Sequence, residues 1–262
     1  MKKLIIAITI FLNITDALIS QNDHAPELVT DRPDQTESAF TVPKGYLQIE
    51  TGIVNETDES IGIKEKTTAW NTTLFRYGLL DNWEIRFGVE YLDYTITDKI
   101  MITENQFSGF SPIIIGTKIL IANENGFIPQ LAFLGHLTIS GTGEGNFFSE
   151  YLASDFRFAL EYSITNNISF GANAGSEWDG VNLNSNNFYS IVLGISPLKN
   201  LGIFIEAYGY ILEKSSPDHR ADVGITYLIK NNLQFDVSTG IGINEIAPDR
   251  FLSAGLSWRI PY

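Results

Sequence analysis

Residues 83–91 read Trp-Glu-Ile-Arg-Phe-Gly-Val-Glu-Tyr, and this stretch decides the fold. Successive side chains of an extended strand point to opposite faces. One face therefore carries Trp83, Ile85, Phe87, Val89 and Tyr91. The other face carries Glu84, Arg86, Gly88 and Glu90. A helix would scatter the two sets around its axis, so the pattern predicts a strand with one apolar and one charged face.

The same alternation recurs after Lys44 and predicts about twelve strands, each close to the length of about nine to eleven residues that a tilted membrane strand needs. The expected ranges are 45–55, 66–78, 82–95, 109–121, 129–140, 152–164, 167–178, 187–196, 201–212, 219–229, 232–243 and 250–262. We therefore predict an all-β chain that forms a transmembrane antiparallel up-and-down β-barrel.

The connections between these strands alternate in length. Short turns are expected at 80–82, 123–126, 165–167, 197–200 and 230–232. Longer loops are expected near 56–65, 96–108, 141–151, 179–186, 213–218 and 244–249. Short periplasmic turns and longer outer loops are typical of outer-membrane barrels. An even number of strands then places both termini on the short-turn side, the periplasm.

Aromatic residues at the strand ends favour the same placement, because Tyr and Trp prefer the membrane–water interface. Near the short turns these interface residues are Tyr77, Trp83, Tyr162, Tyr227, Trp258 and Tyr262. Near the longer loops they are Tyr91, Trp178 and Tyr189. The alternative is the aromatic core of a soluble β-sandwich, which would not sort these residues to strand ends.

The first residues are typical of a secretory signal peptide, which we place at residues 1–20. Lys2 and Lys3 precede an apolar run at 4–14 that is too short to span a bilayer as a helix. Residues 21–43 are polar, contain three prolines and predict an extended arm. The barrel is expected over residues 44–262, in the outer membrane.

Composition excludes several functions. The chain has no cysteine, so disulfides, thiolate metal sites and cysteine nucleophiles are excluded. Its formal net charge of −14 disfavours nucleic acid as a partner. This acidity has two possible explanations: the acidic residues lie in loops that are exposed to solvent, or they bind cations at the outer loops. No cofactor motif and no His/Cys metal spacing occurs, so we expect neither a cofactor nor a metal.

Charged residues occupy the alternate positions of the predicted strands that face the inside of the barrel. We predict that they line the lumen and the solute path. They are Glu50, Arg76, Glu84, Arg86, Glu90, Lys118, His136, Arg157, Glu161, Glu177, Glu206, Asp222, Asp236 and Arg259. Pairing across neighbouring strands would brace the wall. A cation-leaning pathway whose constriction these side chains set is the functional alternative.

The arm has two possible places. Asp31, Arg32, Asp34 and Glu37 could pair with the wall charges, so that residues 21–43 form a lumen plug. The alternative is a periplasmic tail, which is the usual state of terminal segments.

Two segments, TDRPDQTES at 30–38 and PKGYLQIETG at 43–52, resemble the start of an outer-membrane family named for the MetA pathway of phenol degradation. Further agreement lies at 76–88, 108–120, 130–145 and 222–242, so the resemblance covers nearly the whole mature chain. It implies a barrel that passes small compounds, aromatic ones among them. The family name fixes no substrate. Ser140-Gly141 departs from the proline expected before that glycine.

Three functions follow as alternatives. The first is a passive channel for small molecules, aromatic or hydrophobic. The second is a structural or ligand-binding barrel without transport. The third is an outer-membrane hydrolase, which the sequence disfavours because His136 and Ser140 lie about 13 Å apart along a strand. The expected partners are membrane lipid, lipopolysaccharide, a small solute, and the assembly machinery that reads a final strand ending in an aromatic residue.

Overall fold

The computed structural model describes residues 26–181, 184–212 and 215–260. The predicted signal peptide and Tyr262 lie outside the described residues. The strands are β1 (Leu47–Ser60), β2 (Ile63–Ala69), β3 (Thr73–Leu80), β4 (Trp83–Val89), β5 (Tyr91–Asp98), β6 (Thr103–Phe110), β7 (Ile114–Ala122), β8 (Gln130–Thr138), β9 (Ala153–Thr165), β10 (Ile168–Trp178), β11 (Asn186–Leu198), β12 (Leu201–Ile211), β13 (Asp218–Lys230), β14 (Leu233–Gly242) and β15 (Arg250–Ile260). A short 3₁₀ helix, η1 (Gly145–Phe147), follows β8.

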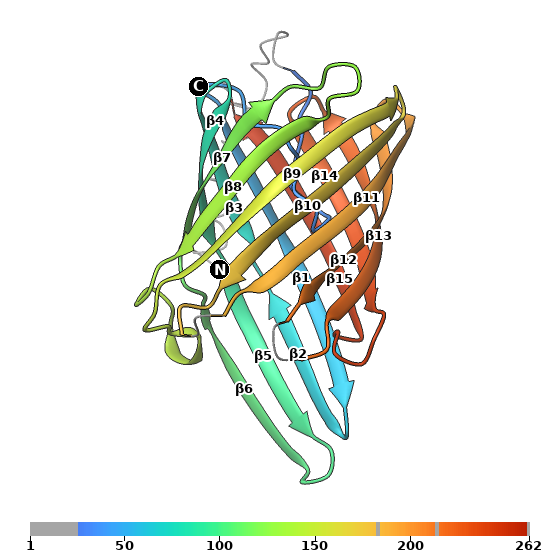
Figure 1. The fold of residues 1–262 in the computed structure, drawn as a ribbon. Helices are drawn as coiled ribbons and strands as arrows, with labels where there is room; N and C mark the ends of the chain where they lie inside the picture. Colours follow the sequence, from blue (N-terminus) through green and yellow to red (C-terminus); the bar gives the residue numbers. More distant parts are fainter. Residues whose placement is uncertain (1–25, 182–183, 213–214, 261–262) are drawn as a thin grey trace, which may run out of the picture.

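These strands form one antiparallel sheet that closes on itself, because β15 pairs with β1 from Leu47↔Ile260 to Thr57↔Arg250. Three barrel strands are interrupted: β2 continues into β3, β4 into β5, and β6 into β7. Fifteen segments with three interruptions make twelve strands around the barrel (Figure 1). The prediction of twelve antiparallel strands is confirmed.

The loops predicted at 56–65 and 96–108 are wrong, because both stretches are mostly strand. β1 runs to Ser60 and turns through Ile61 and Gly62, whose φ angles are 49° and 79°. Together with β2, β5 and β6, the end of β1 forms a four-stranded extension that projects beyond the barrel (Figure 1). Both faces of the extension meet water there, so its sequence lacks the alternation by which the other strands were recognised.

The short connections lie at one end of the barrel, which we call the short-turn end, and the opposite end is the loop end. β1 begins and β15 ends at the short-turn end, since Leu47 pairs with both Ile260 and Tyr77 near the β3–β4 turn. Among the described residues, no helix has the length and apolar character to cross a bilayer.

The barrel is apolar outside and polar inside, the reverse of a soluble protein. Ile205, Val223 and Ile225 on neighbouring strands are 57%, 47% and 51% exposed. By contrast, Arg76 and Lys118 are fully buried inside the cylinder. Hydrocarbon outside the wall explains this arrangement, whereas a soluble β-sandwich would bury its apolar side chains. The sandwich alternative is therefore wrong.

The aromatic residues predicted for the membrane interface point to the outer surface of the barrel wherever the structure describes them. Trp83 and Tyr227 are 39% and 46% exposed near the short turns. The others are half-buried on the same outer surface: Tyr77, Tyr91, Tyr162, Trp178, Tyr189 and Trp258.

Candidate functional site: the arm inside the barrel

Residues 26–43, which we call the arm, form neither helix nor strand and lie against the inner wall of the barrel. The arm starts at the short-turn end, where the Leu28 N–H donates to the Asn231 carbonyl at 3.1 Å. It leaves at the same end, where the Gly45 N–H donates to the Gly78 carbonyl at 2.8 Å. The arm is thus a loop inserted from the short-turn end, with residues 32–37 deepest in the lumen.

Asp31 is the main anchor of the arm. Its carboxylate accepts a hydrogen bond from Lys118 Nζ at 2.7 Å. The same carboxylate lies 3.0 Å from Arg76 Nη1 and 3.2 Å from Arg86 Nη1. All four side chains are buried. One arm carboxylate therefore compensates three wall cations, an arrangement that is stable only while every partner is present.

Arg76 connects this anchor to the wall itself. Its Nη1 lies 2.8 Å from Glu50, and its Nε lies 2.9 Å from Glu84, so it bridges β1, β3 and β4. Its Nη2 also donates to the Phe40 carbonyl of the arm at 3.0 Å. Glu84 in turn accepts the Val42 N–H at 2.7 Å. The wall charges therefore hold one another and the arm in a single network.

Arg32 is the second anchor and lies over two glycines. Gly52 and Gly255 face each other across β1 and β15. A Cβ added at Gly255 would lie 2.4 Å from Arg32 Nε, so only glycine leaves room for the guanidinium. From this slot Arg32 contacts Asp236 at 3.1 Å and Ser253 at 2.9 Å.

We expect Gly255→Ala to displace Arg32, because its guanidinium cannot share the slot with a methyl group. Hydrogen bonds to charged groups contribute about 1.5–3 kcal/mol each. Amide exchange of residues 31–38, measured by mass spectrometry, should therefore rise roughly tenfold to a hundredfold. Gly135→Ala is the matched control, because its added Cβ would lie at ordinary contact distances, 3.4 Å from Phe133 and 3.8 Å from the Asp155 carbonyl oxygen. Unchanged exchange in Gly255→Ala would contradict the role of the slot.

The opposite side of the arm contacts β10, β11 and β12. The Thr36 hydroxyl donates to the Glu206 carboxylate, and its oxygen lies 2.7 Å from Ser190 Oγ, which can donate to it. The Glu37 N–H donates to Asn173 Oδ1 at 2.8 Å, while the Glu37 carboxylate lies 2.5 Å from Arg86. The arm is thus held on both sides of the lumen.

The charged residues predicted on the inward parity all lie there. The buried ones are Glu50, Arg76, Glu84, Arg86, Lys118, Glu206, Asp222, Asp236 and Arg259. The half-buried ones are Glu90, His136, Arg157, Glu161 and Glu177. His136 Nδ1 lies 3.0 Å from Asp155 of the wall. Arg157 donates to the Gln35 carbonyl of the arm at 3.4 Å, and its guanidinium lies 3.9 Å from the centre of the Phe188 ring.

Of the four arm residues singled out by sequence, Asp31, Arg32 and Glu37 form ion pairs with the wall. Asp34 differs, since it lines the cavities on both sides of the arm. Within the described residues, no cluster of His, Asp and Glu side chains is arranged to hold a metal ion.

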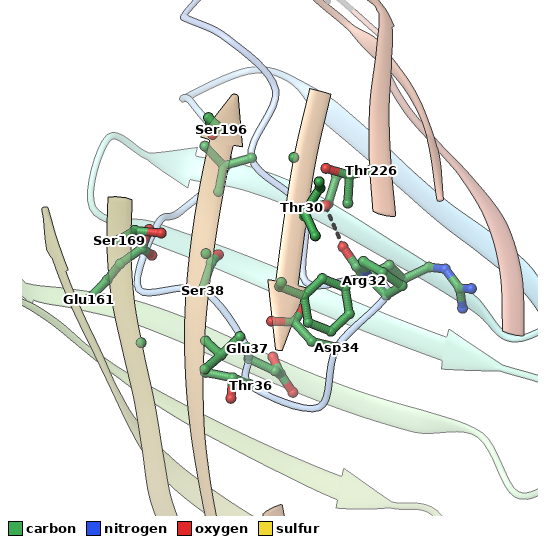
Figure 2. Close-up of a pocket in the computed structure, with 18 of the residues that line it drawn as sticks. Thr30, Arg32, Asp34, Thr36, Glu37, Ser38, Glu161, Ser169, Ser196 and Thr226 are labelled. Atoms are coloured by element: carbon green, nitrogen blue, oxygen red, sulfur yellow. Dashed lines mark hydrogen bonds between the residues drawn. The ribbon is translucent and has the colours of Figure 1, made fainter. Parts of the chain in front are cut away.

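The arm divides the free volume of the lumen. A cavity of about 280 Å³ lies at the short-turn end, between the arm and β9–β14. Figure 2 shows Thr36, Glu37 and Ser38 of the arm beside it, with Glu161 of the wall on one side and Thr226 on the other. Two further cavities, of about 440 and 360 Å³, lie on the loop side of residues 32–35. The arrangement can therefore block a path through the barrel.

Sequence reasoning missed two parts of this site. The first is the glycine slot, whose signal would have been two inward glycines facing each other on the closing strands. The second is a set of inward aromatics near the loop end, namely Phe188, Tyr208, Tyr210 and Phe251. They point to the same face as the predicted lumen charges but carry no charge themselves.

A closed cylinder with an apolar outer surface and a charged interior is the architecture of an outer-membrane β-barrel, and the protein belongs to that class. Solved structures agree on the fold. An outer-membrane channel from Pseudomonas putida F1 has 12% identity and a TM-score of 0.64, over 84% of this chain and 97% of that one. The translocator domain of the autotransporter NalP from Neisseria meningitidis has 11% identity and a TM-score of 0.50, over 83% of this chain and 89% of that one.

The chain belongs to the family described as "Putative MetA-pathway of phenol degradation", whose model matches residues 30–260. This match confirms the resemblance seen in the sequence. It begins at Thr30 and so includes the deepest part of the arm. Among curated protein sequences, none matches the chain.

Proposed function

We propose that the protein is a passive outer-membrane channel for small organic molecules, aromatic or hydrophobic ones among them. The observation that carries the proposal is a polar lumen with cavities on both sides of the arm. The channel from Pseudomonas putida has the same fold and supports the assignment. In this proposal the arm is a plug, and solutes pass when it shifts.

The direct test is solute entry into liposomes that contain the purified protein. We expect entry of small uncharged solutes, and faster entry once residues 21–43 are deleted. If neither the full-length protein nor the deletion variant let solutes enter, the proposal would be contradicted. That result would favour the second candidate, a barrel braced permanently by its arm, which the dense pairing of Asp31, Arg76 and Lys118 supports.

We further propose that the termini face the periplasm and the four-stranded extension faces the outside. The chain lacks cysteine, so single cysteines can report the orientation. Ile61→Cys at the tip of the extension should react with a membrane-impermeant maleimide on intact cells, because Ile61 is 90% exposed. Asn166→Cys in the exposed β9–β10 turn should react only after the outer membrane is permeabilised. The reverse pattern would refute this orientation.

The partners beyond the solute belong to the same proposal. Export would use residues 1–20 as a cleaved signal, and the assembly machinery would read the last strand. Lipopolysaccharide would meet the outer loops through bridging cations. The alternation of β15, with Leu252, Ala254 and Leu256 outward, supports recognition as a closing strand.

We propose no enzymatic activity. The solved structures reported above are a channel and a translocator domain rather than enzymes. His136 contacts Asp155, and His219 Nδ1 lies 2.7 Å from the Tyr189 hydroxyl. A hydrolytic activity of the purified protein that disappears in His219→Ala would overturn this part.

A further inference from the structure

The cavity of about 360 Å³ on the loop side of the arm has an aromatic wall. Tyr208, Tyr210 and Phe251 line it, from β12 and β15. Tyr210 packs against Phe188 with 5.4 Å between ring centroids, and Phe251 belongs to the same buried cluster. Rings held in this way form a rigid apolar surface inside an otherwise polar lumen, and such a surface favours another ring.

The floor of this cavity is the arm. Arg32, Pro33, Asp34 and Gln35 line it opposite the aromatic residues. A molecule bound there would touch the deepest part of the arm, which the Arg32 contacts hold in place. Occupancy of the cavity and the position of the arm are therefore physically linked.

The charges around the cavity set which rings it accepts. Two arginines and three carboxylates line it, and one of the arginines, Arg220, is already paired with Asp218 and Glu56. Arg32 is likewise paired, with Asp236, so an anionic ligand would meet an acidic surrounding in which both cations are engaged. Neutral molecules avoid this repulsion.

Glu90 supplies a specific polar contact. Its half-buried side chain lines both loop-side cavities, at the break between β4 and β5. Among the hydrogen bonds and ion pairs of the described residues, none involves its carboxylate, whereas the neighbouring inward Arg86 is paired with Glu37 and Asp31. An ionised carboxylate only accepts hydrogen bonds, so it would hold a ligand that donates one.

We propose that this cavity binds a neutral one-ring aromatic compound bearing a hydroxyl, with the ring against Tyr210 and Phe251 and the hydroxyl donating to Glu90. Aromatic carboxylates are excluded by charge, and rings without a donor bind more weakly. The inference rests on the proposed channel function and names its substrate class. It also makes the bound solute a direct neighbour of the arm.

The test measures binding of phenol, toluene and benzoate to the full-length protein in lipid nanodiscs. Saturation-transfer NMR reports the binding of each compound. We expect phenol to bind best and benzoate not to bind. Tyr210→Ala should weaken phenol binding about threefold to tenfold, the amount that a lost ring contact contributes. Tyr210→Phe keeps the ring and should bind like the wild type. Tyr227→Ala, which removes an outward-facing ring, is the matched control.

Glu90→Gln tests the polar contact. Removing its charge should reduce the preference for phenol over toluene and allow benzoate to bind. Benzoate bound as well as phenol by the wild type, or phenol binding unchanged in both Tyr210→Ala and Glu90→Gln, would overturn the inference. Heat-modifiable migration of each variant on a gel shows that the barrel has folded.

The two proposals fail separately. Specific phenol binding without solute entry into liposomes would refute the proposed channel function, while the proposed binding site would stand. Solute entry together with phenol binding that is unchanged in the Tyr210 and Glu90 variants would refute the proposed binding site, while the proposed channel function would stand.

Discussion

Asp31→Ala should convert a protein of low conductance in planar lipid bilayers into one that opens often. Asp31 is the only carboxylate of the arm that contacts Lys118, Arg76 and Arg86 together within the described residues. Removing one partner of a buried ionic cluster costs about 3–5 kcal/mol, because the remaining charges lose their compensation. This cost falls on the docked arm alone, since an undocked arm leaves those cations accessible to water.

A change of that size shifts the balance between docked and undocked arm by a factor of roughly 10² to 10³. The measurement is the fraction of time for which single molecules conduct. Glu27→Ala is the matched control, because Glu27 is an exposed arm carboxylate at the short-turn end. Equal conductance in the wild type and Asp31→Ala would show that the arm does not limit passage.

Arg76→Met should strongly destabilise the folded barrel. The Arg76 guanidinium lies between Glu50 and Glu84 of the wall and also contacts Asp31, with no exposed side-chain surface. Methionine fills much of the space but leaves the buried Glu50 without its cation, and it removes the nearest cation of Glu84. We expect the free energy of unfolding to fall by about 3–5 kcal/mol, measured by urea titration of tryptophan fluorescence in lipid vesicles.

Two further variants make this prediction specific. Glu50→Gln placed on Arg76→Met should recover part of the lost stability, because it removes the buried charge that has lost its cation. Arg250→Met removes an exposed arginine of β15 and should change stability little. If Arg76→Met proved as stable as Arg250→Met, the network would not hold the wall together.

Much of the barrel could be predicted because its decisive signal is local. Alternation such as that of Trp83 to Tyr91 depends only on neighbours in sequence, and the hydrocarbon outside imposes it on every membrane strand. The alternation is missing where no hydrocarbon faces the strand. Residues 56–60 and 103–108 pair as strands beyond the barrel, where water on both faces requires no alternation.

The interior was harder to predict, because its contacts join residues far apart in the chain. Parity placed Arg76, Lys118 and Asp236 inside, but nothing in their local sequence tells which arm residue each one meets. Asp31 meets Lys118 across 87 positions, and Arg32 meets Asp236 across 204. Gly255 illustrates the same limit, since its lack of a side chain is explained only by the guanidinium that lies on it.

The central claim is that the docked arm closes the lumen and that its displacement opens it. The most direct measurement uses Thr36→Cys and Ser190→Cys together in the Asp31→Ala background. The two native hydroxyl oxygens lie 2.7 Å apart, so the cysteines can form a disulfide between arm and wall. We predict that the oxidised protein is closed in planar bilayers and that a reductant opens the same molecules. Equal conductance in the oxidised and reduced states, with the cross-link verified by mass spectrometry, would contradict the account.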